Sequence, residues 1–157
     1  MDMQSLTLAR DAMQVIVENV SKKSLDFTSY CAMVVQLPNR NNVRAVVVAQ
    51  AGATASGING RLVDTLDTRF SADGVPIIPC AAPTPGQGTW HMNDAEQQAV
   101  ITVMNPEDTT FAGVAIKAVV ANRPICDQCR FTLKQQGLTL GPAEKPVPLT
   151  ANEAIAS

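Results

Sequence analysis

Two short segments constrain this chain more than any other feature of its sequence. The first contains Asp94 and Glu96, the second contains Cys126 and Cys129, and each looks like the start of a helix. The 29 residues between Glu96 and Cys126 leave room for the rest of a helix, a strand and a loop. A parallel strand–helix–strand return would then bring the two helix starts side by side.

The residue types in these segments suit metal or thiol chemistry. Cys126 and Cys129 are three residues apart, so at a helix start both sulfurs can point to the same side, where the unpaired N–H groups favour thiolates. Glu96 follows Asp94 by two residues, so one carboxylate can bind a metal while the other reaches a water molecule. Taken alone, each segment is ambiguous. Asn93 and Glu96 also fit a capping box, and a lone C-x-x-C serves zinc or redox sites.

Taken together, the two segments resemble the split zinc site of the cytidine-deaminase-like superfamily. In that superfamily an H-x-E type motif opens one helix and a P-C-x-x-C motif opens the next. The resemblance implies that Asp94, Cys126 and Cys129 bind Zn²⁺ and that Glu96, which is not a ligand, moves protons. The compact length and loose motif spacing are similar to the bacterial polymorphic-toxin deaminase domains of the superfamily.

The sequence departs from the common pattern at two places. Asp94 stands where His or Cys is usual, and Ile125 separates Pro124 from Cys126. An Asp ligand with two thiolates makes the site more anionic, and hence a weaker Lewis acid than a site with His. His91, the only His of the chain, is the alternative third ligand or a residue of the substrate pocket.

Several further residues are candidates for contacts with a substrate. The resemblance places the backbone of Ala95 against the base, and Trp90 either stacks on a base or packs beside the pocket. Asn59 is either a contact to the base or sugar or a turn residue before Gly60. Arg123 and Arg130 flank the cysteine pair and are either phosphate contacts or solvated surface charges.

The function implied by the resemblance is zinc-dependent hydrolytic deamination of cytosine in nucleic acid, with single-stranded DNA preferred over RNA and adenine left open as the base. An interbacterial toxin of this type is secreted, acts in the cytoplasm of the target cell, causes mutations and is bound by a cognate immunity protein. Two alternatives remain. One is a thiol–disulfide oxidoreductase using Cys126 and Cys129, and the other is a non-catalytic, zinc-stabilised binding domain.

Hydrophobic patterns predict an α/β layered domain with a central sheet of at least four strands. The resemblance to the cytidine-deaminase-like superfamily implies three layers, with a mixed sheet of about four or five strands flanked by helices. Helices are expected over 5–22, 94–104 and 126–136, and strands over 30–37, 43–50, 111–121 and 138–140. The segment 61–73 is either a short helix or an irregular arm. A single deaminase-like domain is expected over 1–141, with its core over about 25–140, and a flexible tail containing proline over 142–157.

Composition excludes some classes of protein. A net charge of −2 and a pI near 5.3 argue against a strongly basic nucleic-acid binder, although a narrow basic rim around one pocket remains compatible. No apolar run is long enough to span a membrane. The four cysteines are expected to be reduced, with Cys31 buried as a small apolar residue. A closed zinc site formed by Cys31 and Cys80 with the C-x-x-C pair is a further alternative.

Overall fold

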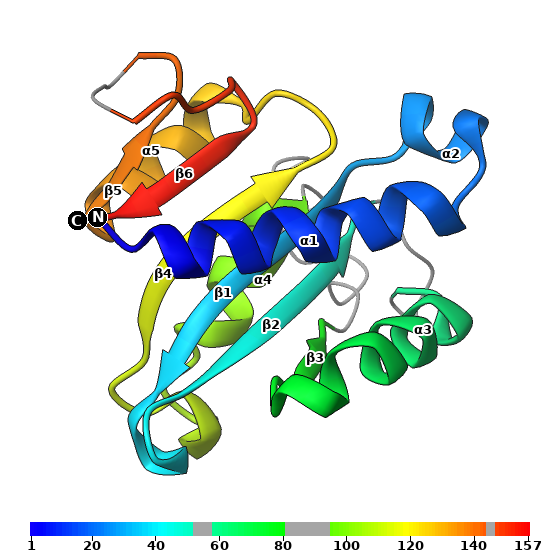
Figure 1. Cartoon of the computed structure of the whole chain (residues 1–157). Coiled ribbons are helices and arrows are strands. Elements are labelled where there is room, and N and C mark those ends of the chain that lie inside the picture. The colour runs from blue at the N-terminus through cyan, green and yellow to red at the C-terminus, as the bar shows by residue number, and fades with distance from the viewer. Residues whose placement is uncertain (52–57, 81–94, 144–146) are drawn as a thin grey trace.

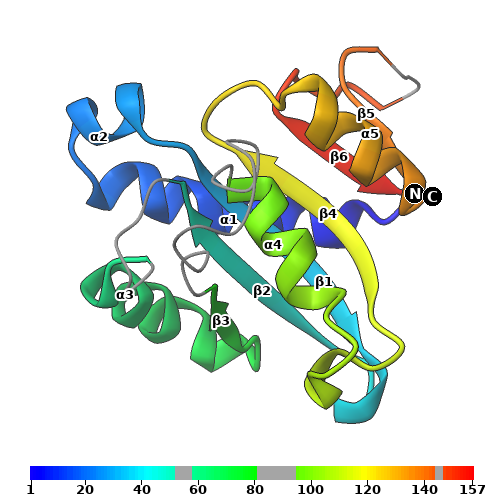
Figure 2. The ribbon, with the colours of Figure 1, turned by 180° about the vertical axis from the view of Figure 1, so that it is seen from behind.

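The computed structural model describes residues 1–51, 58–80, 95–143 and 147–157. These residues form a six-stranded sheet with helices on both faces (Figures 1 and 2), so the α/β prediction is confirmed with slightly more strands than expected. The strand order is β3-β2-β1-β4-β6-β5. The earliest strand therefore lies in the middle of the sheet.

The predicted hairpin has the predicted bounds. Strands β1 (Tyr30–Leu37) and β2 (Val43–Gln50) pair antiparallel in unbroken register. Both are rich in β-branched residues, which favour extended backbone. The turn between them begins with a 3₁₀ segment, Pro38–Arg40, and continues through Asn41 and Asn42 with φ of 58° and 56°. Asn tolerates this left-handed conformation better than most residues, which explains the polar turn sequence.

The remaining strands extend the sheet on both sides of the hairpin. Strand β3 (Ile77–Pro79) pairs parallel with β2, and β4 (Ala115–Ala121) pairs antiparallel with β1. Strand β5 (Leu138–Leu140) occupies the other edge. The strand predicted over 111–121 begins later than expected, because Thr109–Phe111 form a 3₁₀ turn before it.

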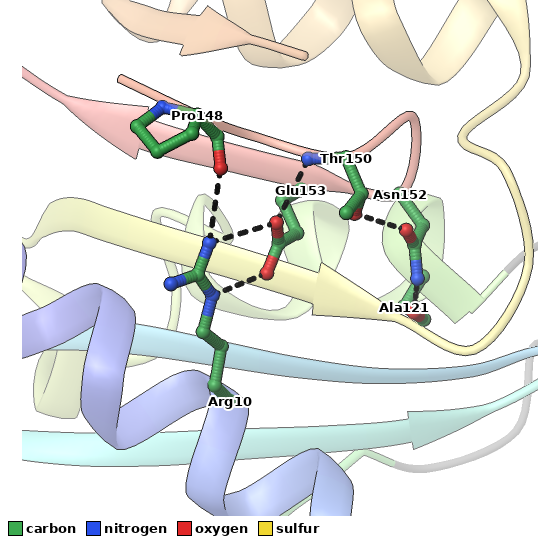
Figure 3. A network of polar contacts seen from close by, with 6 residues as sticks. All are labelled: Arg10, Ala121, Pro148, Thr150, Asn152 and Glu153. Atoms are coloured by element: carbon green, nitrogen blue, oxygen red, sulfur yellow. Dashed lines mark hydrogen bonds and ion pairs between the residues drawn. The ribbon is translucent and has the colours of Figure 1, made fainter. Parts of the chain in front are cut away.

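Strand β6 (Glu153–Ala156) corrects the prediction of a flexible tail over 142–157, which is wrong for these four residues. The strand pairs antiparallel with both β4 and β5 and thus lies inside the sheet. Ala154 and Ile155 are fully buried, and the carboxylate of Glu153 is bound by Arg10 (Figure 3). Asn152, just before the strand, donates to the carbonyl of Ala121 at the end of β4.

Five α-helices are described, and two of them were not firmly predicted. Their bounds are α1 Met3–Asn19, α2 Lys22–Phe27, α3 Gly60–Phe70, α4 Ala95–Val103 and α5 Asp127–Gln135. Helix α3, followed by the 3₁₀ turn Ser71–Asp73, resolves the open choice at 61–73 in favour of a helix. Helix α2 was not expected; its N-cap is Ser21, whose side chain accepts from the N–H of Ser24 at 3.1 Å.

Two hydrophobic clusters define the three layers. Alternate residues of β1, such as Met33 and Val35, pack with α4 and α5, whereas Ala32 and Val34 pack with α1 and α3. The central sheet is therefore covered on both faces, as the apolar run in β2 predicted. Figures 1 and 2 show α1 in front of the sheet in one view and α4 and α5 in front of it in the other. No helix within the described ranges has the length and hydrophobicity needed to cross a bilayer.

Candidate functional site

Helices α4 and α5 begin at the same end of the sheet, on the same face. Strand β3 is parallel to β2, and β4 runs in the same direction because both β2 and β4 are antiparallel to β1. Each of these two parallel-running strands precedes one of the two helices in sequence. The predicted parallel strand–helix–strand connection is thus formed by β3, α4 and β4. Strands β2 and β1 lie between β3 and β4 in the sheet (Figure 2).

Glu96 lies in the first turn of α4 and is buried, with 4% of its surface exposed. Carboxylates are seldom buried unless their charge is balanced or their oxygens are hydrogen-bonded. Glu153 is the other buried acidic residue in the described part of the chain, and it lies on β6 with Arg10. The adjacent Ala95 is fully buried against the sheet, and this packing fixes the position of the first turn of α4 relative to the sheet.

The two cysteines of the C-x-x-C segment occupy different environments at the start of α5. Cys126 is the N-cap residue, partly exposed, and its carbonyl accepts from the N–H of Arg130 at 2.8 Å. Cys129, at the third helical position, is 1% exposed and belongs to the hydrophobic cluster beneath α4 and α5. Cys126 packs against that same cluster, so both thiols lie close to the cluster at the first turn of α5.

Cys31 on β1 connects the two helix starts electrostatically. Burial, followed by smaller electrostatic contributions from Glu96, Cys80 and Cys129, raises the pKa of the Cys31 thiol well above its usual value. Cys31, Cys80, Ala95 and Cys129 belong to one hydrophobic cluster, which places them on the same face of the sheet. The central strand therefore lies beneath a group that contains both the α4 carboxylate and the second α5 thiol. Cys31 is fully buried, as predicted.

The closed site built from four cysteines is not formed. All four cysteines are described and none of them forms a disulfide, and within the described residues no group of three or more His, Cys, Asp or Glu side chains is placed to hold a metal ion. Burial, opposed by a hydrogen bond with Thr102, raises the pKa of Cys80 to about 11, so this residue is a neutral thiol near pH 7. The alternative of a closed structural site is therefore wrong.

The donor set available for zinc is accordingly Cys126 and Cys129 plus a residue of the preceding segment. Asp94 and its alternative His91 lie outside the described residues, as does Trp90. Two thiols at a helix N-terminus, one partly exposed and one buried, fit the thiolate half of a zinc site with an open position. The first described residue after that segment is Ala95, next to the buried Glu96.

The other predicted contact residues differ in their placement: Asn59 lies on the opposite face of the sheet, whereas Arg123 and Arg130 flank the cysteine pair in sequence. Asn59 is the N-cap of α3, where its Oδ1 accepts from the N–H of Arg61 at 2.8 Å, so the turn interpretation describes its local role. Arg130 donates from Nη1 to the carbonyl of Gly141 at 3.1 Å, which ties α5 to the end of β5. Arg123 is exposed before α5 and remains a candidate for a phosphate contact.

Two glutamines of α4 were missed by the sequence analysis. Gln98 is 4% exposed and donates from Nε2 to the carbonyl of Gln50 at the end of β2, at 3.2 Å. Oε1 of Gln97 is buried and has no hydrogen-bond partner among the described residues. The available signal was the density of polar residues at 96–98, just before the apolar half of the helix. Both residues follow Glu96 directly in the first turns of α4.

Comparisons with known proteins do not assign this site. No family model, no curated protein and no solved structure matches the chain.

Proposed function

We propose that this protein is a zinc-dependent hydrolytic deaminase of cytosine in single-stranded nucleic acid. The observation that carries the proposal is a buried Glu96 at one helix start, near the start of a second helix that bears Cys126 and Cys129. A buried acid beside a pair of thiols is the arrangement required when one residue moves protons while others hold a metal.

Zinc fits this donor set through Cys126 and Cys129, with Asp94 as third ligand and His91 as the alternative. When bound, the metal supplies a Lewis acid that makes a water molecule more acidic near pH 7. Cys31 and Cys80, whose pKa values are raised, stay protonated beneath the site and do not compete for the metal. Their role is to fill the apolar floor under the two helices.

Glu96 is the proton-transfer group of the proposed reaction. Its carboxylate takes a proton from the attacking water, whose oxygen forms a bond to C4 of cytosine. The protons then go to N3 of the ring and to the amino nitrogen, which leaves as ammonia when the C4–N bond breaks. Uracil is the product. Because Glu96 is 4% exposed, bulk water does not compete for these protons.

The biological setting is part of the same proposal. A nucleobase deaminase delivered into a competing cell damages nucleic acid, and the producing cell needs an immunity protein that covers the pocket. DNA is the preferred polymer, and the rim beside the site carries Arg123 as an exposed cation. The base is proposed as cytosine from the resemblance to toxin deaminases, and an assay on adenine tests that choice directly.

The test is a deamination assay on single-stranded DNA and RNA oligonucleotides, with zinc measured in the same samples. The native protein should form uracil and contain about one zinc per chain. Glu96→Gln should keep the zinc and lose the activity, because the amide has nearly the same shape but cannot accept the proton. Asp64→Asn, which changes an exposed acid of α3, is the matched control and should retain both properties.

A second candidate function is supported by the unequal burial of the two cysteines. A partly exposed first thiol and a buried second thiol at a helix start also suit thiol–disulfide exchange. This function predicts no zinc, disulfide reductase activity that requires Cys126, and full activity in Glu96→Gln. Zinc in every variant without turnover on any base would instead favour a non-catalytic binding domain.

A further inference from the structure

Oε1 of Gln97 is a buried hydrogen-bond acceptor without a partner among the described residues. A buried amide oxygen that makes no hydrogen bond costs free energy, so folded proteins rarely contain one unless another group completes the bond. Gln97 as a whole is only partly buried, so this oxygen is the end of the side chain that is turned into the protein. The missing partner is an N–H or O–H donor.

The position of Gln97 on α4 follows from the packing of its neighbours. The side of α4 that meets the sheet is formed by its apolar cluster residues, Ala95, Ala99, Val100 and Val103. At 3.6 residues per turn, Gln97 and Gln98 then lie on opposite flanks of the helix. Gln98 donates to the carbonyl of Gln50, so its flank is the one toward the end of β2. Gln97 therefore lies on the flank toward α5, which contacts α4 on the same face of the sheet (Figure 2).

Glu96 lies beside Gln97 on this same side of the helix. One residue turns an α-helix by about 100°, which places Glu96 between the sheet and the flank that carries Gln97. The first turn of α5, with Cys126 and Cys129, begins at the same end of the sheet. A group bound between the two helix starts would therefore meet the carboxylate of Glu96 and the amide oxygen of Gln97 as neighbouring acceptors.

The acceptor character of this oxygen selects the chemistry of the group that binds it. Cytosine carries an exocyclic amine at C4, which is a hydrogen-bond donor, whereas uracil carries an oxygen there, which only accepts. An amide oxygen pairs with the amine and is repelled by the oxygen. Adenine also carries an exocyclic amine. A contact from Oε1 of Gln97 thus distinguishes amino bases from oxo bases and does not choose between cytosine and adenine.

We infer that Gln97 is a specificity-determining residue whose Oε1 accepts a hydrogen bond from the exocyclic amine of the target base. The inference rests on the proposed function for the identity of that base. Hydrolysis replaces the amine by an oxygen, so the acceptor that holds the substrate faces a second acceptor in the product. The same residue therefore favours binding of the cytosine strand and release of the uracil strand.

The test compares the binding of two fluorescent single-stranded oligodeoxynucleotides by anisotropy, one with a central cytosine and the other with uracil at that position. Both are measured on Glu96→Gln protein in the presence of zinc, so that neither strand is converted during the measurement. This protein should bind the cytosine strand about tenfold more tightly, the effect of one hydrogen bond to a buried acceptor. Adding Gln97→Met, which has a similar length but no amide, should abolish the preference.

The matched control is Gln135→Met, which makes the same change at an exposed glutamine at the end of α5 and should leave the preference intact. Urea unfolding without nucleic acid gives a second readout. Gln97→Met should raise the urea midpoint, because it removes a buried acceptor without a partner, whereas Gln135→Met should leave it unchanged. Equal binding of both strands by Glu96→Gln protein, a preference that survives Gln97→Met, or a lower midpoint in Gln97→Met would overturn the inference.

The design separates this inference from the proposed function, because the strand preference is measured without turnover. A cytosine preference that Gln97→Met abolishes, with no deamination by the native protein, would contradict the deaminase proposal and support the contact to the base. Deamination by the native protein, together with a preference that Gln97→Met does not alter, would support the deaminase and exclude Gln97 as the residue that reads the amine.

Discussion

The guanidinium of Arg10 binds the carboxylate of Glu153 through two hydrogen bonds, from Nε to Oε2 at 2.5 Å and from Nη2 to Oε1 at 3.0 Å. This pair joins α1 to β6 across 143 residues of sequence. The N–H of Thr150 also donates to Oε1 of Glu153, at 2.9 Å (Figure 3). Burial alone would raise the pKa of Glu153, but these bonds outweigh it and lower the pKa below the usual value.

The Arg10–Glu153 pair makes stability depend on pH in a defined direction. Because the folded pKa of Glu153 lies below the ordinary value of 4.5, the pair contributes its full stability above that value and loses it as the pH falls through the folded pKa. Arg10→Gln should lower the free energy of unfolding at pH 7 by about 1–2 kcal/mol and flatten the acidic limb of the curve. The side chain of Arg10 is 40% exposed, which keeps this value below that of a fully buried pair.

Urea unfolding at a series of pH values measures both effects. Arg69→Gln is the control, since Arg69 at the end of α3 and Asp73 in the following 3₁₀ turn form an exposed pair four residues apart, and such pairs contribute about 0.3–0.5 kcal/mol. An acidic limb that keeps its full slope in Arg10→Gln would contradict the role assigned to the pair.

Strand β6 should contribute substantially to stability although it is short. Ile155 is fully buried between its neighbours Ala118 on β4 and Thr139 on β5. Ile155→Ala should lower the free energy of unfolding by about 2–4 kcal/mol, because it removes buried carbon and leaves a cavity. Ile101→Ala makes the same change at an α4 position that is 43% exposed, and should cost well below half as much. Equal costs in denaturant unfolding would show that β6 is not part of the stable sheet.

The four thiols should differ in their reactivity toward an alkylating reagent. Cys126 is the partly exposed one, so it should react first, and bound zinc should protect it. Cys31 and Cys80 are buried with raised pKa values, that of Cys80 to about 11, so both should stay unmodified well above pH 8. Mass spectrometry of adducts in zinc-free protein at increasing pH gives the order, with Cys126→Ser as control. Early labelling of Cys31 would contradict the packing of β1 beneath the site.

The choice between Asp94 and His91 is decided by zinc content. The register of the D-x-E segment favours Asp94, so Asp94→Ala should lose zinc to a weak chelator while His91→Ala retains it. The thiol variants Cys126→Ser and Cys129→Ser should lose zinc as well, since removing one of three ligands greatly weakens a site of this type. Retention of zinc by Asp94→Ala and loss by His91→Ala would assign His91 as the third ligand.

The sequence predicted those helices and strands whose conformation is determined by their own residues and immediate neighbours. The bounds of the β1–β2 hairpin follow from two runs rich in valine and a polar turn, whose conformation is set by neighbouring residues. Strand β6 was missed because Glu-Ala-Ile-Ala has little strand preference of its own. It is held by pairing with β4 and β5 and by Arg10, so its conformation depends on residues outside its own segment.

The candidate site was also predicted only in part, because some of its features are local in sequence and others arise only after folding. Spacing alone placed Glu96 and the cysteine pair at two helix starts, because a residue's position within a first turn is a local property. The role of a polar side chain such as that of Gln98 depends on which surface it meets after folding. Sequence therefore could not show that Gln98 contacts the end of β2.

The position of β6 between β4 and β5 has a consequence for the order of synthesis. Strand β5 joins the sheet only through β6, so it has no place to dock until residues 153–156 have emerged from the ribosome. Helix α5 leads directly into β5 and packs against it, so the docking of β5 also completes the packing of α5. We therefore expect a nascent chain that ends before residue 153 to lack a docked β5, and with it the complete packing of α5, although it already contains every residue of the candidate site.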